Sequence, residues 1–265
     1  MQPMRTTNTA TGAIARKLFT VLTLGLLFTA CKKDGDDVAA PGNGGTPALA
    51  ENYFASKVAM QLRYNATGSD GPENHTLTVT GVKDSAGGKV VAYKSVYDDG
   101  TAVTPFIYSK DGAFTLVNTP PAELNAMIEE IKTTPGIADF TLTGLPLQQK
   151  LPANPQAGAA VTFSDPMHMG FSATEEGETY RVDMYFGFSD GKIVGFEDVT
   201  TEAGTFKNCL KWTYKSTITI ETIAGSQETE VASTQWFAKG IGLVKSVDVA
   251  DGETTTTTLT SVTGK

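Results

Sequence analysis

Histidine and cysteine are almost absent from this chain of 265 residues, which holds two of each. The histidines, His75 and His168, lie far apart, and no His-x-x-x-His or Cys-x-x-Cys spacing occurs. Zinc sites need several such ligands at short spacings, so the sequence predicts neither a metal site nor a cofactor. A soft-metal site at Asp165, Met167, His168 and Met169 is the alternative to an ordinary loop or core segment there.

The two cysteines, Cys31 and Cys209, do not form an obvious pair. Exported proteins can carry disulfides, but if Cys31 is chemically modified then Cys209 has no partner within the chain. No histidine stands near Cys209 in the sequence. We therefore predict that Cys209 is a small, half-buried strand residue and not a catalytic thiol.

Positive charge is scarce as well. The chain has 21 Lys and Arg residues against 29 Asp and Glu residues, a formal net charge of −8. The first thirty residues hold three basic side chains and no acid, so their removal changes the net charge from −8 to −11. Such a chain has no general attraction to nucleic-acid phosphates or anionic head groups, and we predict no nucleic-acid partner.

Apolar runs long enough to cross a bilayer are also lacking. The main run, residues 18–28, would form a helix of about 16 Å, half of the ~30 Å hydrocarbon core. Arg5, Arg16 and Lys17 precede this run, and the small residues Thr29 and Ala30 follow it. This order is typical of a secretory signal peptide, which we assign to residues 1–30.

Cys31 comes directly after this segment, and residues 28–31 resemble a lipobox, where bacteria attach lipid to a cysteine thiol and cleave before it. The resemblance implies a mature chain that begins at Cys31 and meets the membrane through its acyl chains. One acyl chain binds only marginally, so stable anchoring takes more than one. The alternative is an ordinary secreted protein in which Cys31 is incidental.

Residues 31–50 are predicted to be the lipidated cysteine and a flexible tether, because they offer too little apolar surface to offset ordering entropy. As a coil, the part after Cys31 spans roughly 24 Å root-mean-square. The acidic segment Asp34-Gly35-Asp36-Asp37 resembles the signal that sends some Bacteroidota lipoproteins to the outer face of the outer membrane. This implies a cell-envelope, outer membrane lipoprotein exposed at the surface; a solvated spacer is the alternative.

Residues 51–265 are predicted to form one β-rich domain. Turn signals such as Asp98-Asp99-Gly100 and Asp251-Gly252 separate strand-like runs, which is typical of an antiparallel meander. In one such run, alternate residues are apolar and should share a buried face. These residues are Leu210, Trp212, Tyr214, Ile218 and Ile220. The threonines at 254–258 predict an outer C-terminal strand.

Two segments are predicted to lie between strands. Residues 145–158 contain Pro146, Pro152 and Pro155, which favour a connection over a ladder. Residues 187–191 match the Gly-x-Ser-x-Gly letters of a hydrolase elbow, but that elbow needs a helix after the serine, and a strand resumes at Lys192. We predict a hairpin turn at residues 189–191.

One helix stands out, after a possible cap at Thr119 and before Pro135-Gly136. Its apolar residues recur at i, i+3, i+4 and i+7, which makes one stripe. The stripe consists of Leu124, Met127, Ile128 and Ile131. We expect this helix to cover the sheet as a lid, with the stripe as a candidate ligand-binding surface.

Residues 199–210 and 235–245 carry a recognisable pair of motifs, Val-Thr-Thr-Glu-Ala-Gly-Thr-Phe-Lys-Asn-Cys-Leu and Gln-Trp-Phe-Ala-Lys-Gly-Ile-Gly-Leu-Val-Lys. The pair resembles exported TapB-like and DUF3108-like β-proteins, which are similar to the LolA/LolB-type half-barrels. The resemblance implies a mainly β fold: a strongly curved antiparallel sheet with one or two covering helices. Trp236 and Phe237 are expected to point to opposite faces.

The leading hypothesis is therefore a non-enzymatic, lipid-anchored envelope protein that binds a hydrophobic ligand or an envelope protein in or on its curved sheet. A structural or adhesive surface lipoprotein is the second hypothesis. A hydrolase with a carboxylate pair is the third, and it would need two acids facing each other in a cleft. No catalytic residue is predicted.

Overall fold

The computed structural model describes residues 52–68, 71–118, 122–175 and 177–264. The predicted signal peptide, Cys31 and the tether lie outside the described residues. The strands are β1 (Gln61–Gly68), β2 (Gly71–Ser85), β3 (Gly88–Tyr97), β4 (Ala102–Val103), β5 (Phe106–Lys110), β6 (Ala113–Asn118), β7 (Ile137–Thr143), β8 (Leu147–Leu151), β9 (Thr162–Phe163), β10 (Met167–Glu175), β11 (Glu178–Thr201), β12 (Gly204–Thr222), β13 (Gly225–Ala238), β14 (Gly242–Ala250) and β15 (Glu253–Thr263). The described part contains one helix, α2 (Ala122–Thr133).

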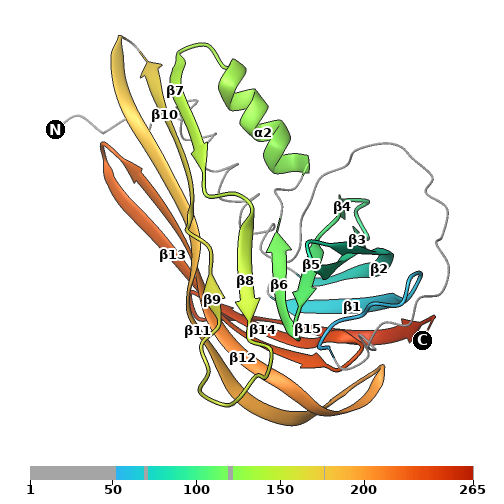
Figure 1. The fold of residues 1–265 in the computed structure, drawn as a ribbon. Coiled ribbons are helices and arrows are strands. Elements are labelled where there is room, and N and C mark those ends of the chain that lie inside the picture. The colour runs from blue at the N-terminus through green and yellow to red at the C-terminus, as the bar shows by residue number, and fades with distance from the viewer. Residues whose placement is uncertain (1–51, 69–70, 119–121, 176, 265) are drawn as a thin grey trace.

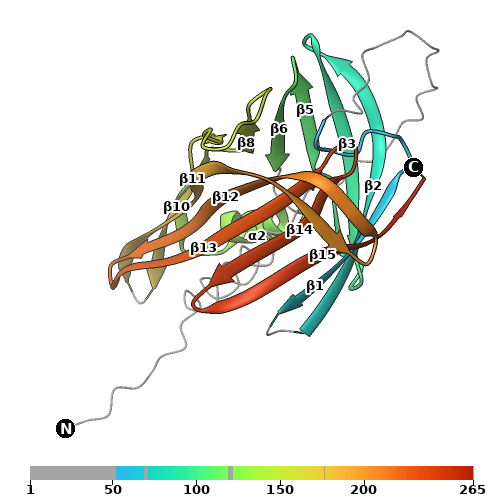
Figure 2. The same ribbon diagram turned by 90° about the horizontal axis from the view of Figure 1, so that it is seen from below.

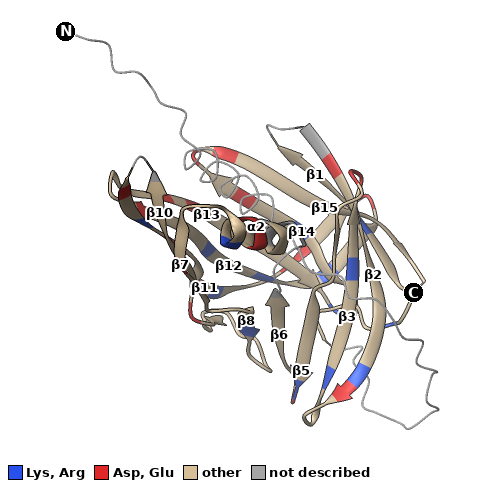
Figure 3. Ribbon diagram, turned by 90° about the horizontal axis from the view of Figure 1, so that it is seen from above, with Lys and Arg blue, Asp and Glu red and all other residues tan. Residues whose placement is uncertain are grey.

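All fifteen described strands join one antiparallel sheet, in the order β7-β10-β11-β12-β13-β14-β15-β1-β2-β3-β5-β6-β8-β9, with β4 paired to β3. The sheet bends strongly around a concave side, and α2 lies at one end of that side (Figures 1 and 2). Seen from above, acidic residues mark the tips of several hairpins (Figure 3). The predicted fold class, a mainly β and strongly curved open sheet, is confirmed.

The segment that leads into β9 folds back onto the middle of β11. Val161 donates its N–H to the Gly191 carbonyl at 2.9 Å, and Ile193 donates to the Ala159 carbonyl at 2.8 Å. A Cβ on Gly191 would overlap the Phe163 ring, so only glycine lets the two segments approach this closely. We name residues 158–163 the closing arm.

The predicted hairpin turn at residues 189–191 is wrong. These residues lie inside β11, where the register against β12 shifts between Ser189 and Lys192 and Asp190 has φ = 55°. An Asp-Gly pair suits a bulge as well as a hairpin, and here the contact with the closing arm favours the bulge.

The strand pairing corrects two other predictions from the sequence. Residues 145–158 are not only a connection, because β8 lies within them and pairs with β6 and β9. Pro146 and Pro152 stand just outside β8 and remove no donor from its ladder. The threonine-rich strand β15 is not outer either, since it pairs with β14 on one side and with β1 on the other.

Inward-facing side chains form two main hydrophobic clusters. The first lies under β1–β3 and the adjoining parts of β11–β14, and includes Leu62, Tyr93 and Trp212. The second lies under α2, β7 and β10 and includes Met184 and Ile220. Strand β12 contributes to both clusters, so its length positions them side by side along one concave face.

Candidate functional site: an apolar cavity in the concave face

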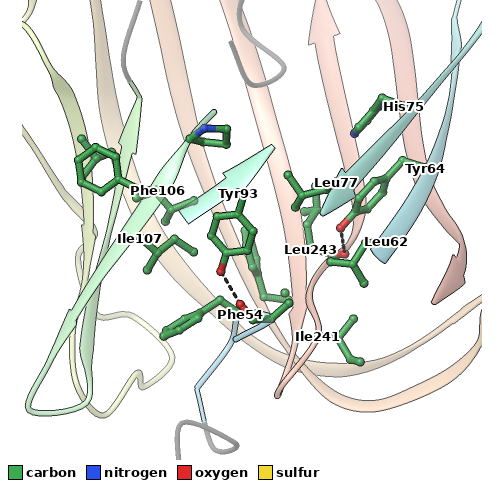
Figure 4. Close-up of a pocket in the computed structure, with 16 residues that line it drawn as sticks. Phe54, Leu62, Tyr64, His75, Leu77, Tyr93, Phe106, Ile107, Ile241 and Leu243 are labelled. Carbon is green, nitrogen blue, oxygen red and sulfur yellow. Dashed lines mark hydrogen bonds between the residues drawn. The ribbon is translucent and has the colours of Figure 1, made fainter. Parts of the chain in front are cut away.

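A cavity lies within the first cluster, between the strands of the N-terminal half and the turn that joins β13 to β14 (Figure 4). Its lining residues are Phe54, Ala55, Leu62, Tyr64, His75, Leu77, Tyr93, Pro105, Phe106, Ile107, Leu116, Val117, Phe237, Ile241, Gly242 and Leu243. The centres of water-sized spheres can occupy about 40 Å³ of it. One water needs roughly 10–15 Å³ by this measure, so a small apolar group fits.

Two tyrosines span the cavity and fix its polar atoms. Tyr64 donates its hydroxyl to the Leu243 carbonyl at 2.9 Å, and Tyr93 donates to the Ala55 carbonyl at 2.6 Å (Figure 4). Burial raises the pKa of both hydroxyls, so they remain protonated and keep donating. Both donors are thus used within the protein.

His75 is the third polar lining residue, and it is held between aromatic rings. Its ring centroid lies 4.8 Å from that of Tyr64 and 4.9 Å from that of Tyr97. Burial lowers the pKa of His75 to about 4, although the negative charge of Asp98 acts in the opposite direction. The imidazole is therefore neutral at physiological pH, and no charged side chain lines the cavity.

One part of the lining comes from outside the sheet. Residues 52–55 cross the first cluster, and we name them the strap. Gly240, in the turn between β13 and β14, donates its N–H to the Asn52 carbonyl at 2.7 Å. Phe54 is buried and packs against Phe114, with ring centroids 5.7 Å apart. The strap is the first described segment of the chain and precedes β1.

The described residues of the predicted ligand-binding stripe, Ile128 and Ile131, do not line this cavity. Ile128 and Ile131 are buried, but they pack in the second cluster under α2. The side chains of Leu124 and Met127 lie outside the described residues. Ligand binding by the stripe thus stays a prediction.

The other candidate residues named from the sequence occupy packed positions with a structural role. Along β10, Met167 and Met169 are buried in the second cluster, whereas His168 faces the other side and contacts Asp183 at 2.7 Å. Cys209 is fully buried in β12, and burial raises the pKa of its thiol to about 11. Among the described residues, no group of three His, Cys, Asp or Glu side chains could hold a metal ion.

Trp236 and Phe237 occupy different surroundings, as expected from their alternation. Phe237 lines the cavity, whereas the Trp236 ring lies between the ammonium groups of Lys211 and Lys245, each 5.0 Å from its centroid. The Trp236 indole donates to Glu197 at 2.5 Å, and this hydrogen bond is the main reason that the pKa of Glu197 is lowered. The contacts of Trp236 thus have a structural role, whereas the Phe237 side chain forms part of the cavity wall.

The sequence matches the DUF3108-like family over residues 74–258. This chain belongs to that DUF3108-like family. A candidate lipoprotein of Parabacteroides distasonis has a similar fold, with a TM-score of 0.52 and 19% identity over 80% of this chain and 98% of that chain. A candidate exported protein of Bacteroides fragilis with a YmcC-like fold gives a TM-score of 0.50 and 16% identity over 80% and 99%.

These comparisons confirm the predicted family resemblance and the fold, and none of them points to an enzyme family. A comparison with curated proteins found no match. The finer likeness to LolA and LolB stays a prediction. Within the described ranges, no helix has the length and hydropathy needed to cross a bilayer.

Proposed function

We propose that this DUF3108-like protein is a non-enzymatic lipoprotein of the cell envelope that holds an apolar ligand in the cavity of its concave face. The observation that carries the proposal is the chemistry of the lining. The cavity has no charged side chain, its tyrosine hydroxyls are already bonded, and His75 is neutral. Concave, mostly apolar pockets with a few fixed polar groups are the usual form of small-molecule sites.

Anchoring at Cys31 is the second part of the proposal. It is supported by the predicted signal peptide and lipobox, and by structural relatives described as a candidate lipoprotein and a candidate exported protein. The acidic segment 34–37, with Asp34, Asp36 and Asp37, supports display on the outer membrane surface. In this proposal the tether ends at the strap, which lines the ligand cavity.

Binding is tested with toluene, an uncharged single-ring probe that suits a cavity of this size, by ligand-detected NMR. We expect saturable binding by the protein and loss of binding in Leu77→Trp, because Leu77 is half-buried in the lining and an indole would fill the space. Leu142→Trp is the matched control, since Leu142 is also half-buried but packs against the second cluster. Equal binding by both variants and the native chain would refute this use of the cavity.

Anchoring is tested by labelling producing cells with an alkyne fatty acid. We expect label on the native chain and none on Cys31→Ala, which should also leave the membrane fraction. Protease treatment of intact cells then distinguishes surface display from an inward-facing location. A native chain without label, or one that retains residues 1–30, would contradict the anchor.

A further inference from the structure

One polar side chain of the cavity has no partner within the described part of the protein. Tyr64 and Tyr93 donate their hydroxyls to backbone carbonyls, but His75 forms no hydrogen bond with another described residue. His75 is 5% exposed, and its ring nitrogens are not among the polar atoms that the surrounding protein encloses completely. Since His75 also lines the cavity, its nitrogens border the free space there. Buried polar groups in folded proteins have partners as a rule, so this one needs a reason.

Neighbouring aromatic rings hold the edge of His75 toward the cavity. Tyr64, His75 and Tyr97 form one row across β1, β2 and β3. The Tyr64 ring stacks on the imidazole, with centroids 4.8 Å apart, and the Tyr97 ring approaches from the β3 side, with centroids 4.9 Å apart. These contacts fix the plane of the imidazole. Figure 4 shows a nitrogen of His75 pointing into the cavity, on the side of Tyr64 and Leu77.

The protonation state of His75 decides which ligand group it can bind. Burial lowers the pKa of His75 to about 4, although the charge of Asp98 acts in the opposite direction, so the imidazole is neutral at pH 7.5. A neutral imidazole offers one N–H donor and one nitrogen acceptor. A hydroxyl group can pair with either of them. A charged group would find no opposite charge among the lining residues and would lose its hydration.

The size and the wall of the cavity limit the rest of the ligand. The free volume of about 40 Å³ for the centres of water-sized spheres corresponds to roughly three waters, which is too little for a long hydrocarbon chain. Phe54, Phe106 and Phe237 contribute aromatic rings to the wall. Aromatic rings pack favourably against one another in tilted or offset arrangements. A single aromatic ring with one small substituent therefore suits this site.

We propose that the cavity binds a small neutral phenol, with the ring among the apolar lining residues and the hydroxyl hydrogen-bonded to His75. The inference rests on the proposed function, because it needs the cavity to bind an apolar ring. It adds the class of ligand and the residue that selects it. The apolar wall alone would take any uncharged ring of this size, and His75 supplies the preference for a hydroxyl.

Phenol and toluene test this with the full chain at pH 7.5, because phenol carries a hydroxyl where toluene carries a methyl group. Dissociation constants are measured by ligand-detected NMR for the native chain and for His75→Phe, which keeps an aromatic ring between Tyr64 and Tyr97. We expect His75→Phe to retain its affinity for toluene. Its affinity for phenol relative to toluene should fall by about tenfold, because the hydroxyl would be left unpaired in an apolar site.

His168→Phe is the matched control. His168 is the other histidine of the chain, and it lies outside the cavity, where it contacts Asp183. Its replacement should leave the ratio of the two dissociation constants unchanged. A fall in the phenol affinity that is equal in His75→Phe and His168→Phe would overturn the role of His75.

A second measurement uses the native chain, so it stays decisive if His75→Phe disturbs the cavity and loses toluene as well. The chain has two histidines, and the imidazole ¹⁵N signals of the untagged, labelled protein are assigned by comparison with the two variants. Phenol should shift the ring-nitrogen signals of His75 and leave those of His168 in place. Toluene should leave both sets nearly unchanged.

The possible failures are distinguishable. If toluene binds but phenol leaves the His75 nitrogen signals unchanged, the phenol proposal is overturned and the proposed function stands. The same holds if His75→Phe binds both ligands with the native ratio. If neither toluene nor phenol binds the native chain, the proposed function itself fails together with this inference.

Discussion

A substitution at Gly170 tests how the edge of the sheet is held. The Arg181 side chain crosses the outer face from β11 over Gly170 in β10 and reaches β7. It binds Asp183 at 3.0 Å and donates to the Asp139 carbonyl at 3.1 Å and to the Thr141 hydroxyl at 3.3 Å. A Cβ on Gly170 would overlap both the guanidinium and the Asp183 carboxylate. Gly170→Ala should therefore push Arg181 off β7.

The size of the effect follows from the exposure of these groups. Arg181 is 39% exposed in its side chain, so solvent screens its interactions and each lost hydrogen bond to β7 costs about 0.5–1 kcal/mol. Replacing glycine also reduces the entropy of the unfolded chain, which returns about 0.4–1 kcal/mol. We expect a net destabilisation of about 1 kcal/mol, measured by urea unfolding, and a Tm lower by about 2–4 °C.

A glycine-to-alanine substitution elsewhere is the control, and a double mutant tests whether Arg181 is the cause. Gly81 is also in a strand, but a Cβ there would meet nothing within 4 Å, so Gly81→Ala should be neutral or stabilising. In an Arg181→Ala background, Gly170→Ala should cost less, because only the Asp183 carboxylate still overlaps the added Cβ. If Gly170→Ala costs the same with and without Arg181, the overlap is not the cause.

Three further outcomes follow from buried groups. Cys209, whose burial raises the thiol pKa to about 11, should resist iodoacetamide at pH 8 until urea unfolds the chain; rapid labelling of the folded protein would contradict the structure. The pKa of His75 is about 4 in the folded chain and ordinarily 6.5, so the unfolded state binds the proton first. Stability should thus fall by up to about 3 kcal/mol as the pH drops from 6.5 to 4, and His75→Phe should lack this component. Gly191→Ala should release the closing arm, seen as faster amide exchange at residues 158–163, whereas unchanged exchange would show that the arm is held by other contacts.

Local patterns in the sequence predicted the sheet well, because strand alternation depends on neighbouring residues alone. Leu210, Trp212, Tyr214, Ile218 and Ile220 share one parity and are all buried. The errors occurred where a distant contact decides between two locally equivalent outcomes. The bulge at residues 189–191 depends on the closing arm, which a local pattern cannot place.

The cavity could not be predicted in the same way. Inward-facing aromatic residues such as Tyr64 and Tyr93 can be identified from strand parity, but a cavity is a mismatch of shapes among several distant elements. The predicted stripe on α2 was chosen because apolar periodicity is visible in the sequence. Periodicity shows which side of a helix is buried and does not show what it is buried against, and Ile128 and Ile131 lie in the second cluster.

Polar side chains separate the two hydrophobic clusters of the concave face. On β12, Trp212 and Tyr214 belong to the first cluster, Ile218 and Ile220 to the second, and the buried Ser216 stands between them. Although Phe188 packs against both clusters, apolar residues in place of the buried Ser233 and Ser246 would leave the Asp248 carboxylate without its two hydroxyl donors.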